Sequence, residues 1–245
     1  MKDVLIGSAV SALSTGLGAV PILFMKRMSH HWRDILLAYT AGIMTAASMF
    51  SLLPEALALS NVFVMSIGLL LGCFALLLLE HFIPHVDLEN TEQRMTTFNL
   101  EQKSFLIIAA ITLHNLPEGL SVGVSYASNA GELGPLIAFS IGLQNMPEGF
   151  LIALFLVHQN VNRWKALGIA TLTGAVEIVT GLLGYSLSSV VGDLVPYGLS
   201  FAAGAMMFIV YKELIPESHG DGHQRSATVS FIMGLITMIS LTEWF

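Results

Sequence analysis

Apolar residues fill long stretches of the chain, and shorter polar segments separate these stretches. A helix needs about twenty mostly apolar residues to cross a bilayer core of ~30 Å. The stretches that reach this length predict membrane-spanning helices at 4–25, 35–58, 62–82, 104–128, 135–158, 166–191, 196–214 and 226–244. The pattern therefore predicts an all-α membrane protein, with eight transmembrane helices in one domain over residues 1–245.

The composition points to the same environment. Hydrophobic residues make up 54% of the chain and charged residues only 11%, whereas soluble domains carry about 25% charged residues. The single cysteine, Cys73, excludes a disulfide framework and a CxxC metal site. The sequence has no Walker-type phosphate loop, and we expect neither an organic cofactor nor a nucleic-acid partner.

The basic residues predict how the helices are oriented. In an eight-helix arrangement nine of them fall on one side of the membrane: Lys26, Arg27, Arg33, Arg94, Lys103, Arg163, Lys165, Lys212 and Arg225. Only Lys2 falls on the other side. Basic residues concentrate in cytoplasmic loops, so both termini are expected outside. A change of one in the number of spans would scatter these charges.

An internal repeat relates the two ends of the chain at an offset of 162 residues. Ala-Gly at 41–42 recurs at 203–204, and Leu-Pro-Glu at 53–55 recurs as Ile-Pro-Glu at 215–217. The two spans concerned would cross in opposite directions, and inverted repeats are typical of secondary transporters. The expected 3+2+3 arrangement has repeat 1 at about 4–82, a central pair at 104–158 and repeat 2 at about 166–244.

Two similar hexapeptides lie inside the central pair: His-Asn-Leu-Pro-Glu-Gly at 114–119 and Gln-Asn-Met-Pro-Glu-Gly at 144–149. Ionisable groups within a membrane span are costly, so they usually mark an ion, a proton or a partner charge. At ~1.5 Å per helical residue, both motifs and Glu177 of the next span lie near the bilayer midplane. The shared depth predicts one polar centre built from three helices.

Helical spacing brings the polar groups of each motif together. Residues three or four apart share a helix face, so Glu118 has His114 and Asn115 beside it. Glu148 has Gln144 and Asn145 beside it in the same way. Carboxylates with one imidazole, several amides and no thiolate suit divalent ions such as Zn²⁺, Cd²⁺, Fe²⁺ or Mn²⁺.

Structural roles are open for the same residues. The carboxylates of the two motifs could be hydrogen-bonding hubs, and His114 could be a satisfied core histidine. Gln144 could cap the carbonyl that Pro147 leaves unpaired. Asn115 and Asn145 could hold helices together, and Glu177 could form an ion pair elsewhere.

The paired motifs and the eight-span plan resemble the ZIP (Zrt/Irt-like protein) metal transporters, especially bacterial members with short loops. The resemblance implies a binuclear centre, with His114, Glu118, Gln144 and Glu148 at the first site, Asn115, Asn145 and Glu177 at the second, and Glu118 and Glu148 bridging both. Many members have His at the position of Gln144, and some have Asp at that of Asn145. Both departures are expected to weaken metal binding.

The resemblance also implies transport toward the cytoplasm by alternating access, without ATP. It implies a multi-pass protein of the bacterial cytoplasmic (inner) membrane, with Zn²⁺ as the foremost cargo and a homodimer as one assembly. A passive, channel-like metal conduit is the alternative. An intramembrane metallohydrolase is not expected, because the chain lacks HExxH, so the protein is not expected to be an enzyme.

Further polar residues lie near the ends of the spans. A cytoplasmic exit route is expected at Glu213, Glu217, His219 and His223, although these residues could also form an ordinary solvated helix end. Glu55, at the outer end of the second span, could belong to the entrance. His81 and His85, at the start of the 83–103 connection, could capture metal or belong to a solvated linker.

Overall fold

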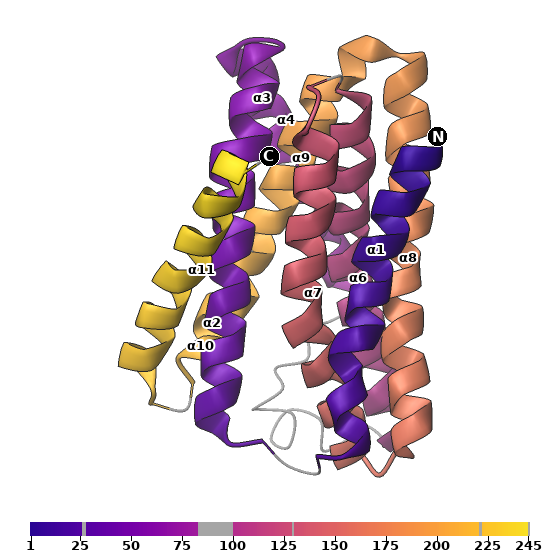
Figure 1. Ribbon diagram of the computed structural model, residues 1–245, viewed down its shortest axis with the longest axis vertical. Coiled ribbons are helices and arrows are strands. Elements are labelled where there is room, and N and C mark those ends of the chain that lie inside the picture. The colour runs from indigo at the N-terminus through magenta and orange to yellow at the C-terminus, as the bar shows by residue number, and fades with distance from the viewer. Residues whose placement is uncertain (26–27, 83–99, 129, 221, 245) are drawn as a thin grey trace.

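The computed structural model describes residues 1–25, 28–82, 100–128, 130–220 and 222–244 (Figure 1). Most of the 83–103 connection, His85 included, lies outside the described residues, and so does the side chain of His81. The described part is helical and contains no strand. This confirms the predicted all-α class.

The helices follow the predicted apolar stretches closely. The α-helices are α1 Lys2–Ala19, α2 His30–Ala46, α3 Leu53–Ala58, α4 Val62–Phe82, α6 Leu100–Ala127, α7 Leu133–His158, α8 Arg163–Val190, α9 Val195–Ile209, α10 Ile215–Ser218 and α11 Gln224–Trp244. Short 3₁₀ segments occur at η1 Val20–Leu23 and η3 Gly192–Leu194, and π-helical segments at η2 Ala47–Leu52 and η4 Val210–Leu214.

Local sequence explains where several helices begin. Asn61 accepts hydrogen bonds from the backbone N–H groups of Phe63 and Val64 at the start of α4. Asn162 accepts one from Trp164 at the start of α8. Asparagine at these positions satisfies N–H groups that have no partner inside the helix. These caps fix the turns between neighbouring spans.

Seven helical segments in the described residues are long and apolar enough to cross a membrane. They are Lys2–Leu23, His30–Ala58, Val62–Leu79, Leu133–His158, Arg163–Val190, Gly192–Ser218 and Gln224–Trp244. The 28-residue helix α6 lies where the fourth span was predicted, but it is not among the seven. The eighth span therefore stays a prediction.

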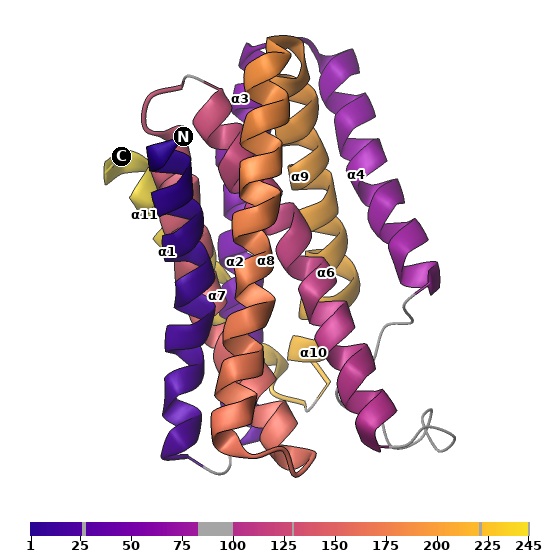
Figure 2. The same cartoon turned by 90° about the vertical axis from the view of Figure 1, so that its right-hand side faces the viewer.

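The helices pack as two groups that meet along the middle of the bundle (Figures 1 and 2). In one group α1 packs against α7 and α8, and α6 packs against α8. In the other group α2 packs on α11, and α4 packs on α9. The groups touch chiefly where α6 meets α9 and where α2 meets α7. The two motif helices thus lie at the junction.

Both chain ends lie at the same end of the bundle, the upper end in Figures 1 and 2. Helix α2 rises toward this end, whereas α9 descends from it (Figure 1). Each of the two is followed by a π segment and then by a proline, at positions related by the repeat offset. These features agree with the repeat in this pair of helices. The inversion of the complete three-helix units and the outside location of the termini remain predictions.

Two motif glycines allow very close helix packing. A Cβ placed on Gly149 of α7 would lie 1.9 Å from the carbonyl oxygen of Thr15 in α1. One placed on Gly119 of α6 would lie 2.5 Å from the Cα of Glu177 in α8. Small residues let membrane helices approach to backbone contact. The motif glycines therefore allow the helices around the polar centre to pack in backbone contact.

Candidate metal centre

Helices α6, α7 and α8 place most of the predicted ligands in the interior. The side chains between 0% and 2% exposed are Asn115, Glu118, Gln144, Asn145 and Glu177. His114 and Glu148 are half-buried. Buried polar groups need hydrogen-bond or metal partners, because removal from water without one costs several kcal/mol. The contacts of these side chains therefore indicate which kind of ligand the centre could bind.

Glu118 and Gln144 form the first contact across the two motifs. The Gln144 side-chain amide donates to Oε1 of Glu118 over 2.7 Å. Oε2 of Glu118 and Oε1 of Gln144 are buried and have no hydrogen-bond partner. Both orphan atoms are acceptors. A cation could therefore bind to these two oxygens without displacing a hydrogen-bond donor.

Asn145 and Glu177 form a second contact, between α7 and α8. The Asn145 amide donates to Oε1 of Glu177 over 2.7 Å. The Ser11 hydroxyl of α1 donates to Oε2 of the same carboxylate, and Asn145 also donates to the Ser11 carbonyl oxygen over 3.3 Å. Oδ1 of Asn145 is buried without a partner. Each motif amide thus donates a hydrogen bond to one carboxylate, while its own oxygen accepts none.

His114 contacts a residue that we predicted for the exit route. Its Nε2 lies 2.5 Å from Oε2 of Glu213, and Glu213 is itself buried. The prediction ended the seventh span at residue 214, but the helical segment continues through η4 and α10 to Ser218. Glu213 therefore lies inside the bundle, at the edge of the centre.

The carboxylates of the centre are close enough for their charges to interact. Glu118 lies within electrostatic range of Glu148 and Glu177, and Glu148 within range of His114 and Glu213. Like charges repel strongly where little water screens them. A bound cation would relieve this repulsion.

The predicted ligands meet in pairs and do not surround one common point. Among the described residues, no three His, Cys, Asp or Glu side chains are placed to hold a metal ion as they stand. Asn115 is buried with its side-chain nitrogen unpaired, and no contact with Asn145 or Glu177 is seen. The binuclear ligand set therefore stays a prediction.

Sequence reasoning missed Ser11. A signal for it was present, because Ser8, Ser11 and Thr15 recur at three- and four-residue spacing within the first apolar stretch. All three are buried, on the helix that packs against α7 and α8. Serine and threonine are also common in membrane helices as packing residues, so the spacing alone could not assign a role.

Replacement of Ser11 by alanine should destabilise the metal-free protein. A hydrogen bond to a charged group contributes about 1.5–3 kcal/mol, and Ser11→Ala removes one from Glu177. Thermal unfolding in detergent should therefore begin at a lower temperature, and Zn²⁺ should restore most of the loss by neutralising the carboxylate. Ser14→Ala is the matched control, because the Ser14 hydroxyl donates to the Val10 carbonyl oxygen of its own helix. Equal unfolding of the two variants without metal would contradict the role of Ser11.

The other predicted exit residues lie toward the end of the bundle opposite the chain ends. Glu217, in α10, lies within electrostatic range of His114, and His219 follows α10 directly. His223 precedes α11 and lies against Asp34 of α2, 3.0 Å from Nδ1 to Oδ2. A continuous exit route remains a prediction.

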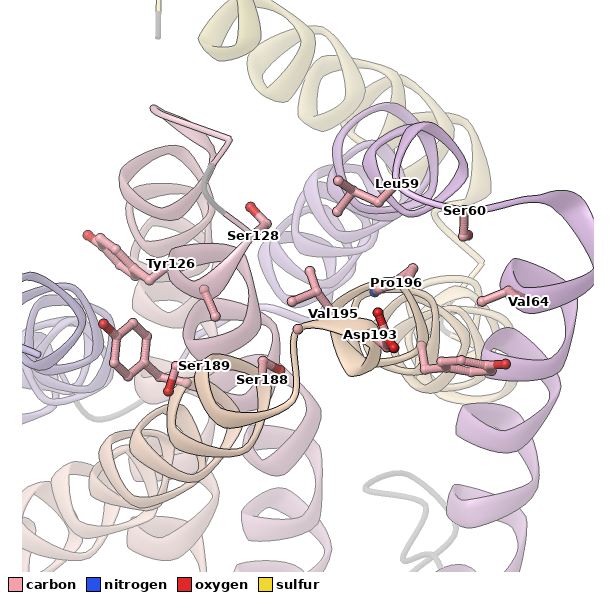
Figure 3. A pocket seen from close by; sticks show the side chains of 14 residues that line it. Leu59, Ser60, Val64, Tyr126, Ser128, Ser188, Ser189, Asp193, Val195 and Pro196 are labelled. Atoms are coloured by element: carbon pink, nitrogen blue, oxygen red, sulfur yellow. The ribbon is translucent and has the colours of Figure 1, made fainter.

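A hollow of about 560 Å³ lies at the end of the bundle that holds the chain ends (Figure 3). Hydroxyl groups of Ser60, Ser128 and Ser188 face it, together with the carboxylate of Asp193. Glu55 is not among its lining residues, although Leu59 and Ser60 beyond it are. The predicted entrance at Glu55 remains a prediction.

Comparisons with known proteins agree with the motif pair. A model of the ZIP Zinc transporter family matches residues 87–242. The chain is 36% identical to the zinc transporter GufA of Myxococcus xanthus, over 97% of this chain and 96% of that protein. It is 34% identical to the zinc transporter ZIPB of Bordetella bronchiseptica, over 96% of this chain and 79% of that protein. The zinc transporter ZupT of Stenotrophomonas maltophilia is 28% identical over 96% of this chain.

The family match covers more than half of the chain. Two relatives are more than 30% identical in sequence, in alignments that cover nearly all of the chain. The paired motifs on α6 and α7 lie inside the matched region. The chain therefore belongs to the ZIP zinc transporter family.

Proposed function

We propose that this protein carries divalent metal ions, Zn²⁺ foremost, across the bacterial inner membrane toward the cytoplasm. The observation that carries the proposal is the set of fully buried carboxylates, Glu118 and Glu177, held by amides whose own oxygens have no partner. Ionised carboxylates are rarely left in a low-dielectric interior without a cation or a proton. Relatives named as zinc transporters support zinc as the cargo.

A metal ion could bind between each motif amide and its carboxylate if the amide turned. At present Gln144 and Asn145 direct their nitrogens at Glu118 and Glu177. Rotation of each amide plane would exchange nitrogen for oxygen, and an oxygen facing a carboxylate is stable only with a cation between them. Both groups would then be ligands. The two carboxylate–amide contacts support a binuclear centre with one ion at each.

The unequal exposure of the motif residues supports release of the ion at the end opposite the termini, in one state of an alternating-access cycle. His114 precedes Glu118 on the rising helix α6, and Glu148 follows Gln144 on the descending helix α7 (Figure 1). Within each motif helix the half-buried residue is thus the lower one, with Glu118 above His114 and Gln144 above Glu148. The predicted cytoplasmic side is the lower one.

An enzymatic role is not supported. Residues 119–123 do match the pattern GxSxG of serine hydrolases, but they lie within the continuous helix α6. The Ser121 hydroxyl donates to the Glu118 carbonyl of its own helix. A nucleophile on a strand-to-helix turn would be needed for that chemistry. The named relatives are transporters.

Uptake of radioactive Zn²⁺ by proteoliposomes tests the proposal. Uptake should saturate with Zn²⁺ concentration, Cd²⁺ should compete better than Mg²⁺ because imidazole is a ligand, and protein-free vesicles should show none. Uptake should also scale with the fraction of molecules whose termini face the bath, measured by protease removal of a terminal tag. Flux that rises linearly without saturation would favour a channel, and absence of uptake would overturn the proposal.

A further inference from the structure

A group of histidine and aspartate side chains lies away from the centre, at the end of the bundle opposite the chain termini. His31 and Asp34 belong to the first turns of α2, and His223 directly precedes α11. The two helices begin side by side at this end (Figure 1) and are packed along their length. The chain therefore brings residues almost two hundred positions apart into one cluster.

Asp34 is the buried member of this cluster. It is fully buried, while the side chain of His223 is 39% exposed. Oδ2 of Asp34 lies 3.0 Å from Nδ1 of His223, but Oδ1 is buried and has no hydrogen-bond partner among the described residues. A hydrogen bond that links α2 to α11 would explain the position of Oδ2 but not the burial of Oδ1. A buried carboxylate oxygen without any donor needs a further explanation.

His31 supplies a second unused ligand atom beside it. Its ring lies edge-on to the ring of His223, with 4.7 Å between the centroids. Nδ1 of His31 is buried and has no hydrogen-bond partner in the part of the chain that the structure describes. Two unused ligand atoms, one on a carboxylate and one on an imidazole, thus lie beside a second imidazole. Two imidazoles and a carboxylate are a ligand set that suits zinc.

We propose that His31, Asp34 and His223 bind a divalent ion such as Zn²⁺, at a site distinct from the centre between the motif helices. The choice of ion rests on the proposed function, whereas the choice of ligands rests on the contacts and the unpaired atoms of these three residues. As the side chains stand they do not surround a common point, because His223 contacts Asp34 directly. Zinc bonds of 2.0–2.2 Å in tetrahedral geometry separate two ligand atoms by about 3.3 Å. The observed 3.0 Å contact would need to widen only slightly.

The position of the cluster fits the release of metal. His223 follows Glu213, Glu217 and His219 along the chain. Helix α10, which carries Glu217, packs against α2, which carries His31 and Asp34. An ion that leaves the centre past Glu213 would meet His31 and His223 before the solvent. An exposed imidazole beside a buried carboxylate can take up an ion and give it up again.

Zinc titration of the purified protein tests this site without any transport measurement. The variant Glu118→Gln/Glu148→Gln disables the motif centre, and we expect it still to bind about one Zn²⁺ per chain. Further replacement with His31→Ala and His223→Ala should weaken that binding at least about tenfold. Asp34→Asn should act in the same way, because it keeps the shape of the side chain and removes its charge. Zinc-edge X-ray absorption should show imidazole ligands before these changes.

His158→Ala is the matched control, because His158 is an exposed histidine at the lower end of α7. It should leave the remaining zinc bound, and all variants should elute as folded protein. Absence of zinc from Glu118→Gln/Glu148→Gln, or binding that survives both His31→Ala and His223→Ala, would overturn the site. Transport by the unmodified protein would stand in either case. Conversely, residual zinc together with absent uptake would overturn the proposed function and leave this site intact.

Discussion

Glu118→Gln should lower Zn²⁺ uptake by at least about 100-fold. Loss of residues that merely support metal ligands already costs 10–100-fold in affinity or activity, and Glu118 is expected to bind the metal itself and to bridge two ions. Glutamine keeps the volume of the side chain and can still contact Gln144, so the packing should survive. Initial rates of radioactive zinc uptake by proteoliposomes measure the effect.

The same substitution should make the metal-free protein more stable. It replaces a buried carboxyl group, whose ionised form the neighbouring carboxylates repel, with a neutral amide, which avoids the cost of an uncompensated buried charge. A lower uptake with a higher unfolding temperature would show that function is lost without loss of fold. Glu132→Gln is the matched control, because Glu132 is exposed at the start of α7 and its side chain makes no cap hydrogen bond. Uptake by Glu118→Gln within a factor of two of the control would remove Glu118 from the centre.

Gly149→Ala should destabilise the fold by about 3 kcal/mol, near the upper end of the usual cost of overpacking. The added methyl group would lie 1.9 Å from the Thr15 carbonyl oxygen and 3.0 Å from its Cα. These are backbone atoms, which no side-chain rotation can move aside, so α1 and α7 would have to separate. Thermal unfolding in detergent, followed by circular dichroism, should show a clearly lower midpoint.

Gly168→Ala provides the opposite expectation within the same bundle. Gly168 is an exposed residue of α8, and nothing lies within 4 Å of a Cβ placed on it. Alanine is more favourable than glycine in a helix interior by roughly 0.5–1 kcal/mol, so this variant should be slightly more stable. If Gly149→Ala unfolds at the same temperature as Gly168→Ala, the close contact between α1 and α7 is not needed for the fold.

The apolar pattern was sufficient to predict most of the architecture. In a bilayer every backbone group must be paired within the protein, so a long apolar stretch has almost no alternative to a helix. The predicted stretch at 135–158 and the helix Leu133–His158 differ by two residues at one end. Glu118, Gln144 and Glu177 are buried in the bundle, and their common depth at the bilayer midplane stays a prediction.

The contacts within the centre could not be predicted in the same way. Periodicity places residues on the face of one helix, but it does not say which helix lies opposite. Glu213, which contacts His114, lies within the π segment η4, and no residue pattern had predicted that segment. Ser11 meets Glu177 because α1 crosses α8 at that height. Both contacts depend on how distant helices pack, which no local pattern in the sequence specifies.

The pairing of carboxylates with amides has a consequence for the return step of the proposed transport cycle. A carrier must cross back without cargo, and each unpaired carboxylate left in the interior would make that step unfavourable. Gln144 and Asn145 donate to Glu118 and Glu177, and these hydrogen bonds would stabilise the two carboxylates during the step without cargo. Imidazole or carboxylate at these two positions would bind the ion more tightly but would hold the empty carrier less well. In the proposed cycle the second motif would therefore favour a fast return of the empty carrier over tight binding of the ion.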